Sequence, residues 1–354
     1  MNPNRQAKSS LQAVKSIADP SLFTRGSDDS FIALIVYVDD ILVASSKIAL
    51  IQQIKHLLNA AFKIKDLGVL GYFLGMEAKL SNEGLNLCQR KYALDIFSDA
   101  CLLECKPVHT TMVPGAHLLR GDGVPLEDPA SYRRLVGRLL YLTATSPDIT
   151  YDVHQLSQFV STPTDKHMAA AHRVLRYIKG SPGQGLFYPA NTTLTLKAFS
   201  DSDWASCPET RKSITGFRVF LGDALVSWRS KKQPTVSRSS SEAEYLSLAA
   251  TAYELQWINS LVQDLHVNLT NPALVFCDNK SAIAISENCV FHERTKNIDI
   301  NYHLVRERVA QGLIKLMSVS SLHQIADGFT KPLAASLFDM FVSKLGVQDL
   351  HSPA

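Results

Sequence analysis

Residues 194–204 read LTLKAFSDSDW, and this stretch sets the architecture of the C-terminal part of the chain. Apolar residues at 194, 196 and 198 alternate with polar residues at 195 and 197, which predicts a half-exposed β-strand followed by Asp201. A second strand, the short apolar run Leu274–Cys277, is followed directly by Asp278. Acids at the carboxyl ends of neighbouring strands in a sheet flanked by helices point into one crevice. The two aspartates are therefore expected to lie close together.

The segments around these two strands predict a mixed sheet. Residues 215–221 and 224–229 read as strands joined at Gly222-Asp223, a hairpin signal. A long helix is expected over about 241–265, and shorter helices over 280–286 and 301–311. Three strands followed by helices that alternate with strands indicate an α+β fold, with a mixed β-sheet flanked by helices.

Two further acids can join the pair at the strand ends. Glu244 opens the long helix, and Asp327 lies beyond the strand expected at 313–319, near the start of a final helix. Together with Asp201 and Asp278 they can hold two divalent ions, Mg²⁺ or Mn²⁺. One ion would activate water, and the other would stabilise the leaving 3′ oxygen of a phosphodiester.

Each of these acids also has a purely structural interpretation. Asp201 can be a turn residue, Asp278 the N-cap of the next helix, and Asp327 a first-turn acid favoured by the helix dipole. Glu242 and Glu244 each stand three residues after a serine, so either can complete a capping box. Because residues two apart on a helix point about 200° away from each other, the two glutamates cannot both face the ions.

The N-terminal block carries a second acidic motif. Apolar runs at 31–38 and 41–44 flank Asp39 and Asp40, which predicts a hairpin of two buried strands, followed by an amphipathic helix over 48–62. Two adjacent carboxylates repel each other, and Mg²⁺ between them would relieve the repulsion. A solvated Asp-Asp turn is the alternative.

Basic residues gather in two places. Helices are predicted between about 127 and 179, and the second carries Arg173, Arg176 and Lys179 at a spacing of three. Between 205 and 240 basic residues outnumber acids, and they include Arg211, Lys212, Lys231 and Lys232. Such sets can bind a phosphate backbone, or they can be solvated faces.

The composition excludes several classes of protein. With 46% apolar and 19% charged residues the chain is an ordinary globular one, and a net charge of +3 is too small to indicate nucleic acid by itself. The six cysteines show no CxxC or Cys/His spacing, so we expect no structural zinc and reduced thiols in the cytoplasm or nucleus. Residues 1–10 lack an apolar signal core, and the run at 31–38 is too short for a bilayer, so a soluble, non-secreted protein is expected.

Motifs in the first part of the chain resemble the reverse transcriptases of copia-type retrotransposons. The string YVDDILV at 37–43 resembles their polymerase motif, and KDLG at 65–68 with YFLGME at 72–77 resembles the segment that follows. YRRLVG at 132–137 resembles the family's later helical region.

Later motifs are similar to the ribonuclease H domain of the same elements. They are FSDSDW at 199–204, RKSITG at 211–216, VSWRSKKQ at 226–233, SSEAEY at 240–245, CDN at 277–279, RTKNIDI at 294–300 and IADGFTKP at 325–332. The resemblance implies that Asp201, Glu244, Asp278 and Asp327 hold the ions and cut the RNA strand of RNA–DNA hybrids. It favours Glu244 over Glu242, because the family's glutamate is typically followed by an apolar residue, here Tyr245.

The chain departs from the family pattern in two respects. Only thirty residues precede Phe31, and no acid among them stands in an apolar strand, so Asp39 and Asp40 are expected to form an incomplete metal site and polymerase activity to be lost. Gly328 stands where the family usually has a bulkier apolar residue, and it is expected to loosen a helix by up to about 1 kcal/mol and to free Asp327. A histidine assists in some family enzymes, but neither His303 nor His323 is assigned that role.

The resemblance implies four parts: an N-terminal remnant, partly disordered, at 1–30, a truncated reverse-transcriptase palm at 31–125, a helical thumb or connection at 126–185, and a ribonuclease H-like domain at 186–345. The expected function is hydrolysis of the RNA strand of hybrids. The alternatives are a non-catalytic nucleic-acid-binding remnant and a decayed gene product without a role. Expected partners are RNA–DNA hybrid or other nucleic acid, and other parts of a retroelement polyprotein.

Overall fold

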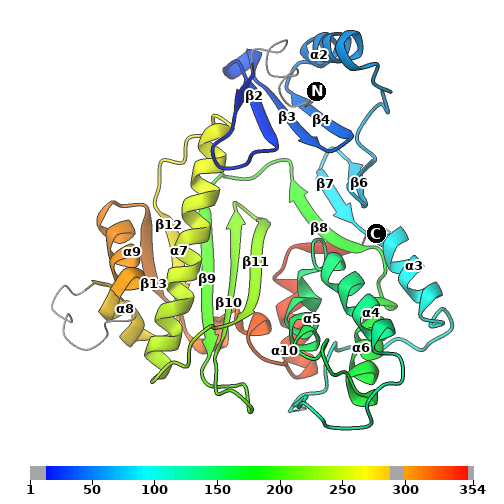
Figure 1. The fold of residues 1–354 in the computed structure, drawn as a ribbon. Helices are drawn as coiled ribbons and strands as arrows, with labels where there is room; N and C mark the ends of the chain where they lie inside the picture. Colours follow the sequence, from blue (N-terminus) through cyan, green and yellow to red (C-terminus); the bar gives the residue numbers. More distant parts are fainter. Residues whose placement is uncertain (1–12, 116, 288–298, 350–354) are drawn as a thin grey trace. The chain divides into compact units, whose positions relative to one another are not determined.

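The protein is described by a computed structural model, which covers residues 13–115, 117–287 and 299–349 (Figure 1). Cys289 and residues 294–298 of the RTKNIDI motif lie outside these residues, as does the first part of the segment expected to be disordered. The chain forms two compact units, residues 1–74 with 254–270, and residues 75–253 with 271–354. No helix among the described residues has the length and apolar character needed to cross a bilayer.

The first unit is a small antiparallel sheet covered by a helix. Its strands are ordered β1-β2-β3-β4, and Ile54 and Leu58 of the helix pack on Phe23, Ile32 and Leu34 of the sheet. The bounds are β1 Val14–Lys15, β2 Leu22–Arg25, η1 Asp28–Ser30, β3 Ile32–Tyr37, β4 Asp40–Ser45 and α2 Ile48–Phe62. The short strand β5 (Tyr72–Phe73) is not part of this sheet. The predicted hairpin and the predicted helix over 48–62 are both present.

The second unit contains a helical layer. Its helices are α3 Arg90–Asp99, α4 Pro129–Leu142, η2 Pro147–Ile149, α5 Thr150–Ser157 and α6 Asp165–Ile178. Sequence signals define their starts: Asp128 accepts a hydrogen bond from the amide of Ala130, and Pro129 follows the cap. The apolar residues at helical spacing in α4 and α6 form one buried core, as their periodicity predicts.

The central sheet of the second unit has the order β11-β10-β9-β12-β13. Its strands are β9 Leu196–Asp203, β10 Ile214–Leu221, β11 Ala224–Lys232, β12 Ala273–Cys277 and β13 Ile314–Ser318. The first three pair antiparallel, whereas β12 runs parallel to both β9 and β13. The predicted mixed sheet is therefore confirmed. β9 runs further than expected, through Asp201 to Asp203, because it stays paired with β10 over that length.

Helical segments cover both faces of this sheet. The long helix α7 (Ser240–Asp264) packs on one face, where Ser247 Oγ lies 2.9 Å from Ser200 Oγ. The opposite face contacts η4 (Asp327–Phe329) and α10 (Ala335–Ser343), which follow η3 (Ser321–His323). The remaining helices are α8 (Lys280–Glu287) and α9 (Asp299–Ala310), which contact each other and β13 (Figure 1).

A buried arginine joins α10 to the sheet. Arg218 of β10 is inaccessible to solvent, and its guanidinium lies over the rings of Phe199, Phe220 and Phe341. Its Nη1 donates a hydrogen bond of 3.3 Å to the carbonyl of Lys344, just beyond the end of the helix. A cation at a helix C-terminus interacts favourably with the helix dipole, so Arg218 helps to fix the helix that follows Asp327.

A second sheet connects early and late parts of the chain. β8 (Gln184–Pro189) pairs with β7 (Gly84–Cys88), which pairs with β6 (Met76–Leu80), and the terminal strand β14 (Val347–Asp349) pairs with β8. This pairing holds residues 84–88, 184–189 and 347–349 in one sheet. The domain limits expected at 125 and 185 stay predictions.

Candidate active site

Asp201 lies inside β9 on the face that meets η4. Its side chain is buried, and Thr330 Oγ1 donates a hydrogen bond to Oδ2. Burial, and next the negative charge of Asp327, raise the pKa of Asp201 to about 7. The proximity of Thr330 depends on Gly216, the residue paired with Asp201, because a Cβ at position 216 would stand 2.5 Å from Thr330 Cγ2.

Glu244 lies one turn into α7 and is also buried. Its Oε1 accepts a hydrogen bond of 3.2 Å from the amide of Ser202. Burial, and next the charges of Asp201 and Asp278, raise the pKa of Glu244 to about 9. The structure therefore brings Glu244 to the aspartates.

The other glutamate, Glu242, has a capping role. Its amide donates to Ser239 Oγ at 3.2 Å, and its Oε2 accepts from the amide of Arg238 at 2.8 Å. Glu242 therefore belongs to the helix cap, although its side chain accepts from Arg238 and not from the amide of Ser239 as in a regular capping box, and the two glutamates divide between cap and cluster as helix geometry requires.

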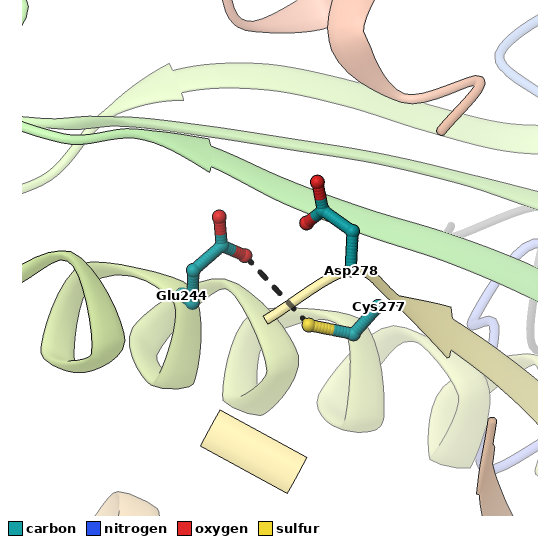
Figure 2. A group of neighbouring side chains, drawn as sticks. All are labelled: Glu244, Cys277 and Asp278. Carbon is teal, nitrogen blue, oxygen red and sulfur yellow. Dashed lines mark hydrogen bonds between the residues drawn. The ribbon is translucent and has the colours of Figure 1, made fainter. Parts of the chain in front are cut away.

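Asp278 directly follows β12, as expected. Its Oδ2 accepts a hydrogen bond of 2.7 Å from Ser321 Oγ. The N-cap interpretation of Asp278 is wrong, because Asn279 Oδ1 accepts from the amide of Ala282 and caps α8 instead. Figure 2 shows the carboxyl groups of Glu244 and Asp278 projecting toward the same side, with the Cys277 thiol below them, 3.8 Å from Glu244 Oε2.

Asp327 comes from a tighter element than expected. The three-residue 3₁₀ helix η4 carries it, whereas the final α-helix begins only at Ala335. Its Oδ2 lies 3.0 Å from Lys331 Nζ. Burial raises the pKa of Asp327, although the charge of Lys331 acts in the opposite direction.

Gly328 does not loosen this element. It is buried, and a Cβ there would stand 2.6 Å from the ring of Phe341 in α10. Glycine is therefore the residue that lets η4 pack against α10. The expectation that Gly328 frees Asp327 is wrong, because helix propensity does not govern a residue whose side-chain space is filled by a ring.

Two buried glutamines hold the acid-bearing segments against the sheet. Gln233 Nε2 lies 3.0 Å from the carbonyl of Ala243, next to Glu244, and 3.1 Å from Thr215 Oγ1 on β10. Gln324 Nε2 donates to the carbonyl of Ser200 at 2.9 Å, next to Asp201. Sequence reasoning did not select these glutamines. Gln233 is the last residue of the motif VSWRSKKQ at 226–233, whereas no local pattern distinguishes Gln324.

The donor set suits a hard divalent cation. One possible ligand atom from each of Glu244, Cys277 and Asp278 lies within 4.8 Å of the other two. Burial, and next the charge of Glu244, raise the pKa of the Cys277 thiol, so this sulfur remains a protonated neighbour rather than a thiolate ligand. Carboxylate oxygens then remain, which Mg²⁺ and Mn²⁺ prefer. The mutual repulsion of the acids is the property that a bound cation would relieve.

The other predicted acidic pair lies at the tip of a hairpin. Tyr37 pairs with Asp40 across a two-residue turn of Val38 and Asp39, and both aspartates are exposed. Among the described residues, three side chains that could bind a metal lie together at Glu244, Cys277 and Asp278, and neither Asp39 nor Asp40 belongs to this group. This arrangement agrees with the solvated turn, and the metal role of Asp39 and Asp40 stays a prediction.

The basic stripe of α6 makes contacts within the chain. Arg173 Nη2 donates to Thr110 Oγ1 at 2.8 Å, Arg176 Nε donates to the carbonyl of Lys106 at 2.8 Å, and Lys179 Nζ donates to the carbonyl of Leu103. These bonds hold the segment 103–110 against the helix. A nucleic-acid role for the stripe stays a prediction, and it would have to coexist with these contacts.

The second basic set is more open. Arg211 and Lys231 are exposed, whereas Lys212 and Lys232 are partly buried. Lys232 Nζ is shared between Gln158 Oε1 and Cys207 Sγ, each at 2.9 Å. Arg211 and Lys231 are therefore better placed than Lys232 to meet a phosphate backbone.

The raised pKa values predict that the metal-free protein loses stability as the pH rises. The folded pKa of Glu244, about 9, exceeds its ordinary value of 4.5. The folded state therefore binds this proton more tightly, and the stabilisation present below about pH 4.5 is lost as the pH rises toward 9. Urea unfolding in EDTA should show this fall between pH 7 and 9, and Glu244→Gln should flatten it. Equal slopes in the two proteins would contradict the assignment.

The central sheet, with the order β11-β10-β9-β12-β13, agrees with the ribonuclease H-like domain that the sequence motifs predict. A family model described as "Reverse transcriptase (RNA-dependent DNA polymerase)" matches residues 8–114. The Pol polyprotein of transposon RE1 from Arabidopsis thaliana is 44% identical over 94% of the chain, and the putative transposon Ty5-1 protein from Saccharomyces cerevisiae is 31% identical over 66%. The chain belongs to the family of copia-type retrotransposon Pol polyproteins.

The chain covers different shares of the length of its relatives. The chain spans 23% of the RE1 polyprotein and 77% of the Ty5-1 protein. A solved structure of the foamy viral protease–reverse transcriptase in complex with RNA/DNA hybrid has a TM-score of 0.48 at 12% identity, covering 81% of this chain and 36% of the other. The observation that supports the fold is the strand order of the central sheet.

Proposed function

We propose that the protein hydrolyses the RNA strand of RNA–DNA hybrids at Asp201, Glu244, Asp278 and Asp327. The observation that carries this proposal is the convergence of four acids from β9, α7, the end of β12 and η4. The charge of Asp201 acts on the pKa of Glu244, and the charges of Asp327 and Asp278 act on that of Asp201. A structural role alone does not explain why four acids that repel each other gather in one half-buried place.

The arrangement suggests how the residues would share two ions. The charges of Asp327 and Asp278 both act on Asp201, and those of Asp201 and Asp278 act on Glu244, so these four residues would hold the ions between them. When bound, the ions would activate water and stabilise the leaving 3′ oxygen. The amide of Ser202 orients Glu244, and the hydroxyl groups of Thr330 and Ser321 orient Asp201 and Asp278.

The substrate class follows from the family. Hybrid duplexes are recognised mainly through backbone shape, and 2′-hydroxyl groups distinguish the RNA strand. The exposed Arg211 and Lys231 would contact phosphates. The rest of a longer polyprotein is a further proposed partner, because the RE1 relative is about four times the length of the matched region.

The test uses the full chain and a hybrid with a labelled RNA strand, in Mg²⁺ and in Mn²⁺. We expect metal-dependent cleavage that EDTA stops, and Asp278→Asn should reduce it to background. The matched control is Glu242→Gln, which removes a neighbouring charge at the cap and should leave cleavage largely unchanged. Cleavage that survives in Asp278→Asn would refute the assignment.

Nucleic-acid binding without catalysis is the second candidate, favoured by the exposed basic residues between 205 and 240. Binding of the hybrid should weaken steeply with salt, and Lys231→Ala should reduce the slope of log Kd against log salt by about one. Salt-dependent binding without metal-dependent cleavage would favour this candidate over the nuclease.

We propose that the hairpin acids Asp39 and Asp40 do not support polymerisation by themselves. Nucleotidyl transfer by two metals draws on carboxylates from separate segments, whereas Asp39 and Asp40 are adjacent, exposed residues at the tip of one hairpin. Primer extension on an RNA template should therefore give no product with this chain. Synthesis that is abolished by Asp39→Asn would contradict the proposal.

A further inference from the structure

Lys331 provides a positive charge to one half of the acidic cluster. Its Nζ lies 3.0 Å from Asp327 Oδ2, and it also interacts with the charges of Asp201 and Asp203. No ion pair within the described part of the chain involves Glu244 or Asp278. The protein's own ammonium group thus contacts Asp327, one of the two acids that would hold a divalent ion on this side of the cluster.

An ammonium group and a divalent cation repel each other strongly at such short range, most of all where water is largely excluded. A metal that binds to Asp201 and Asp327 must therefore displace Lys331 or bind weakly beside it. The displaced ammonium group of Lys331 then needs another anionic partner.

Asp152 of α5 is placed to receive it. Asp152 and Lys331 line the same small cavity, which also borders Gly328. Only 3% of Asp152 is exposed, and its Oδ1 has no hydrogen-bond partner among the residues that the structure describes. Burial raises the pKa of Asp152 to about 7. Buried carboxylate oxygens are rarely left without a partner, so this atom requires an explanation.

The cavity matches an ammonium group in size. Its volume of about 10 Å³ accommodates one water-sized group, which an ammonium resembles. The planar guanidinium of an arginine is considerably larger and would not enter without moving the lining side chains. The cavity therefore distinguishes lysine from arginine at position 331.

We propose that Lys331 is an exchangeable internal cation, which pairs with Asp327 in the metal-free protein and moves to Asp152 when a divalent ion binds to Asp201 and Asp327. This inference rests on the proposed two-metal site and extends it. Asp152 is then a positioning residue, which acts on the metal only through Lys331. The competing arrangement is a lysine that stays at Asp327 and permanently replaces one ion.

The test measures Mn²⁺ binding to the full chain by the electron paramagnetic resonance signal of the free ion, without substrate. All proteins carry Asp39→Asn and Asp40→Asn, so that the hairpin acids do not contribute. Lys331→Met removes the competing charge and should tighten the weaker of two Mn²⁺ sites about tenfold. Asp152→Asn removes the receiving charge and should weaken that site by a similar factor.

The double variant decides between the two arrangements. If Asp152 acts only through Lys331, adding Asp152→Asn to Lys331→Met changes nothing, whereas independent effects would add. Lys331→Arg gives a second test that leaves Asp152 intact: it keeps the ion pair with Asp327 but does not fit the cavity, so Mn²⁺ should bind more weakly than in the parent protein.

Three results would overturn the exchange: additive effects in the double variant, unchanged Mn²⁺ affinity in Lys331→Arg, or one bound ion in the parent protein against two in Lys331→Met. Each leaves the proposed nuclease site standing. Absence of Mn²⁺ binding in every folded variant would instead refute the metal site itself. Circular dichroism of each variant establishes that it is folded.

Discussion

Glu244→Gln is expected to reduce hybrid cleavage by far more than a hundredfold and at the same time to stabilise the metal-free protein. Loss of a residue that only hydrogen-bonds to a metal ligand typically reduces metal affinity or activity 10- to 100-fold. Glu244 is proposed to bind the metal directly, so its loss should cost more. The amide side chain can still accept the hydrogen bond from Ser202. It removes a carboxyl group that the folded state must keep protonated beside Asp201 and Asp278, whereas the unfolded state ionises it.

Opposite changes in activity and stability are the signature of this substitution. Near pH 8 in EDTA, the free energy of unfolding should rise by up to about 5 kcal/mol, because pH 8 lies about 3.5 units above the ordinary pKa of 4.5 and one unit corresponds to about 1.4 kcal/mol. Urea unfolding and cleavage of a labelled hybrid measure the two effects. A loss of both activity and stability would mean that Glu244 is a structural residue.

Gly216→Ala, on the strand β10 that pairs with β9, should disturb the position of Asp201 and Asp327. The added methyl group would lie 2.5 Å from Thr330 Cγ2 and 2.9 Å from Phe329 Cβ, closer than such atoms approach. Because η4 and Thr330 must move away, Asp201 loses its hydrogen bond and Asp327 shifts. We expect a destabilisation of about 1–3 kcal/mol and a cleavage rate reduced by about a hundredfold.

Gly137 supplies the matched control for this change. It lies in the middle of α4, and a Cβ there would meet nothing within 4 Å. Gly137→Ala should therefore stabilise the protein by up to about 1 kcal/mol and leave cleavage unchanged. If both glycine variants behaved alike, the close approach of Thr330 to β10 would not be needed for the site.

Local sequence patterns predicted the features of the site that depend only on neighbouring residues. The strand-end placement of Asp278 follows from a short apolar run, and the separation of Glu242 from Glu244 follows from helix periodicity. The mixed sheet was predictable for the same reason. Alternation, turn residues and helix stops are properties of neighbouring residues, and the structure retains them.

Long-range packing was not predictable in this way. The role of Gly328 depends on the ring of Phe341, thirteen positions away, and that of Gly216 depends on Thr330. Helix propensity alone gave the wrong expectation for Gly328, because tertiary contacts override it. The pairing of β8 with β7 and β14 joins segments with no shared local pattern.

That pairing bears on how the chain can be divided. A fragment that starts at residue 186 to isolate the nuclease would cut β8 near its beginning and remove its neighbour β7. A fragment that stops at residue 345 would also lose β14. Both edges would then expose unpaired backbone groups, which favours aggregation. A fragment that keeps this sheet intact must therefore include residues 84–88 together with residues 347–349.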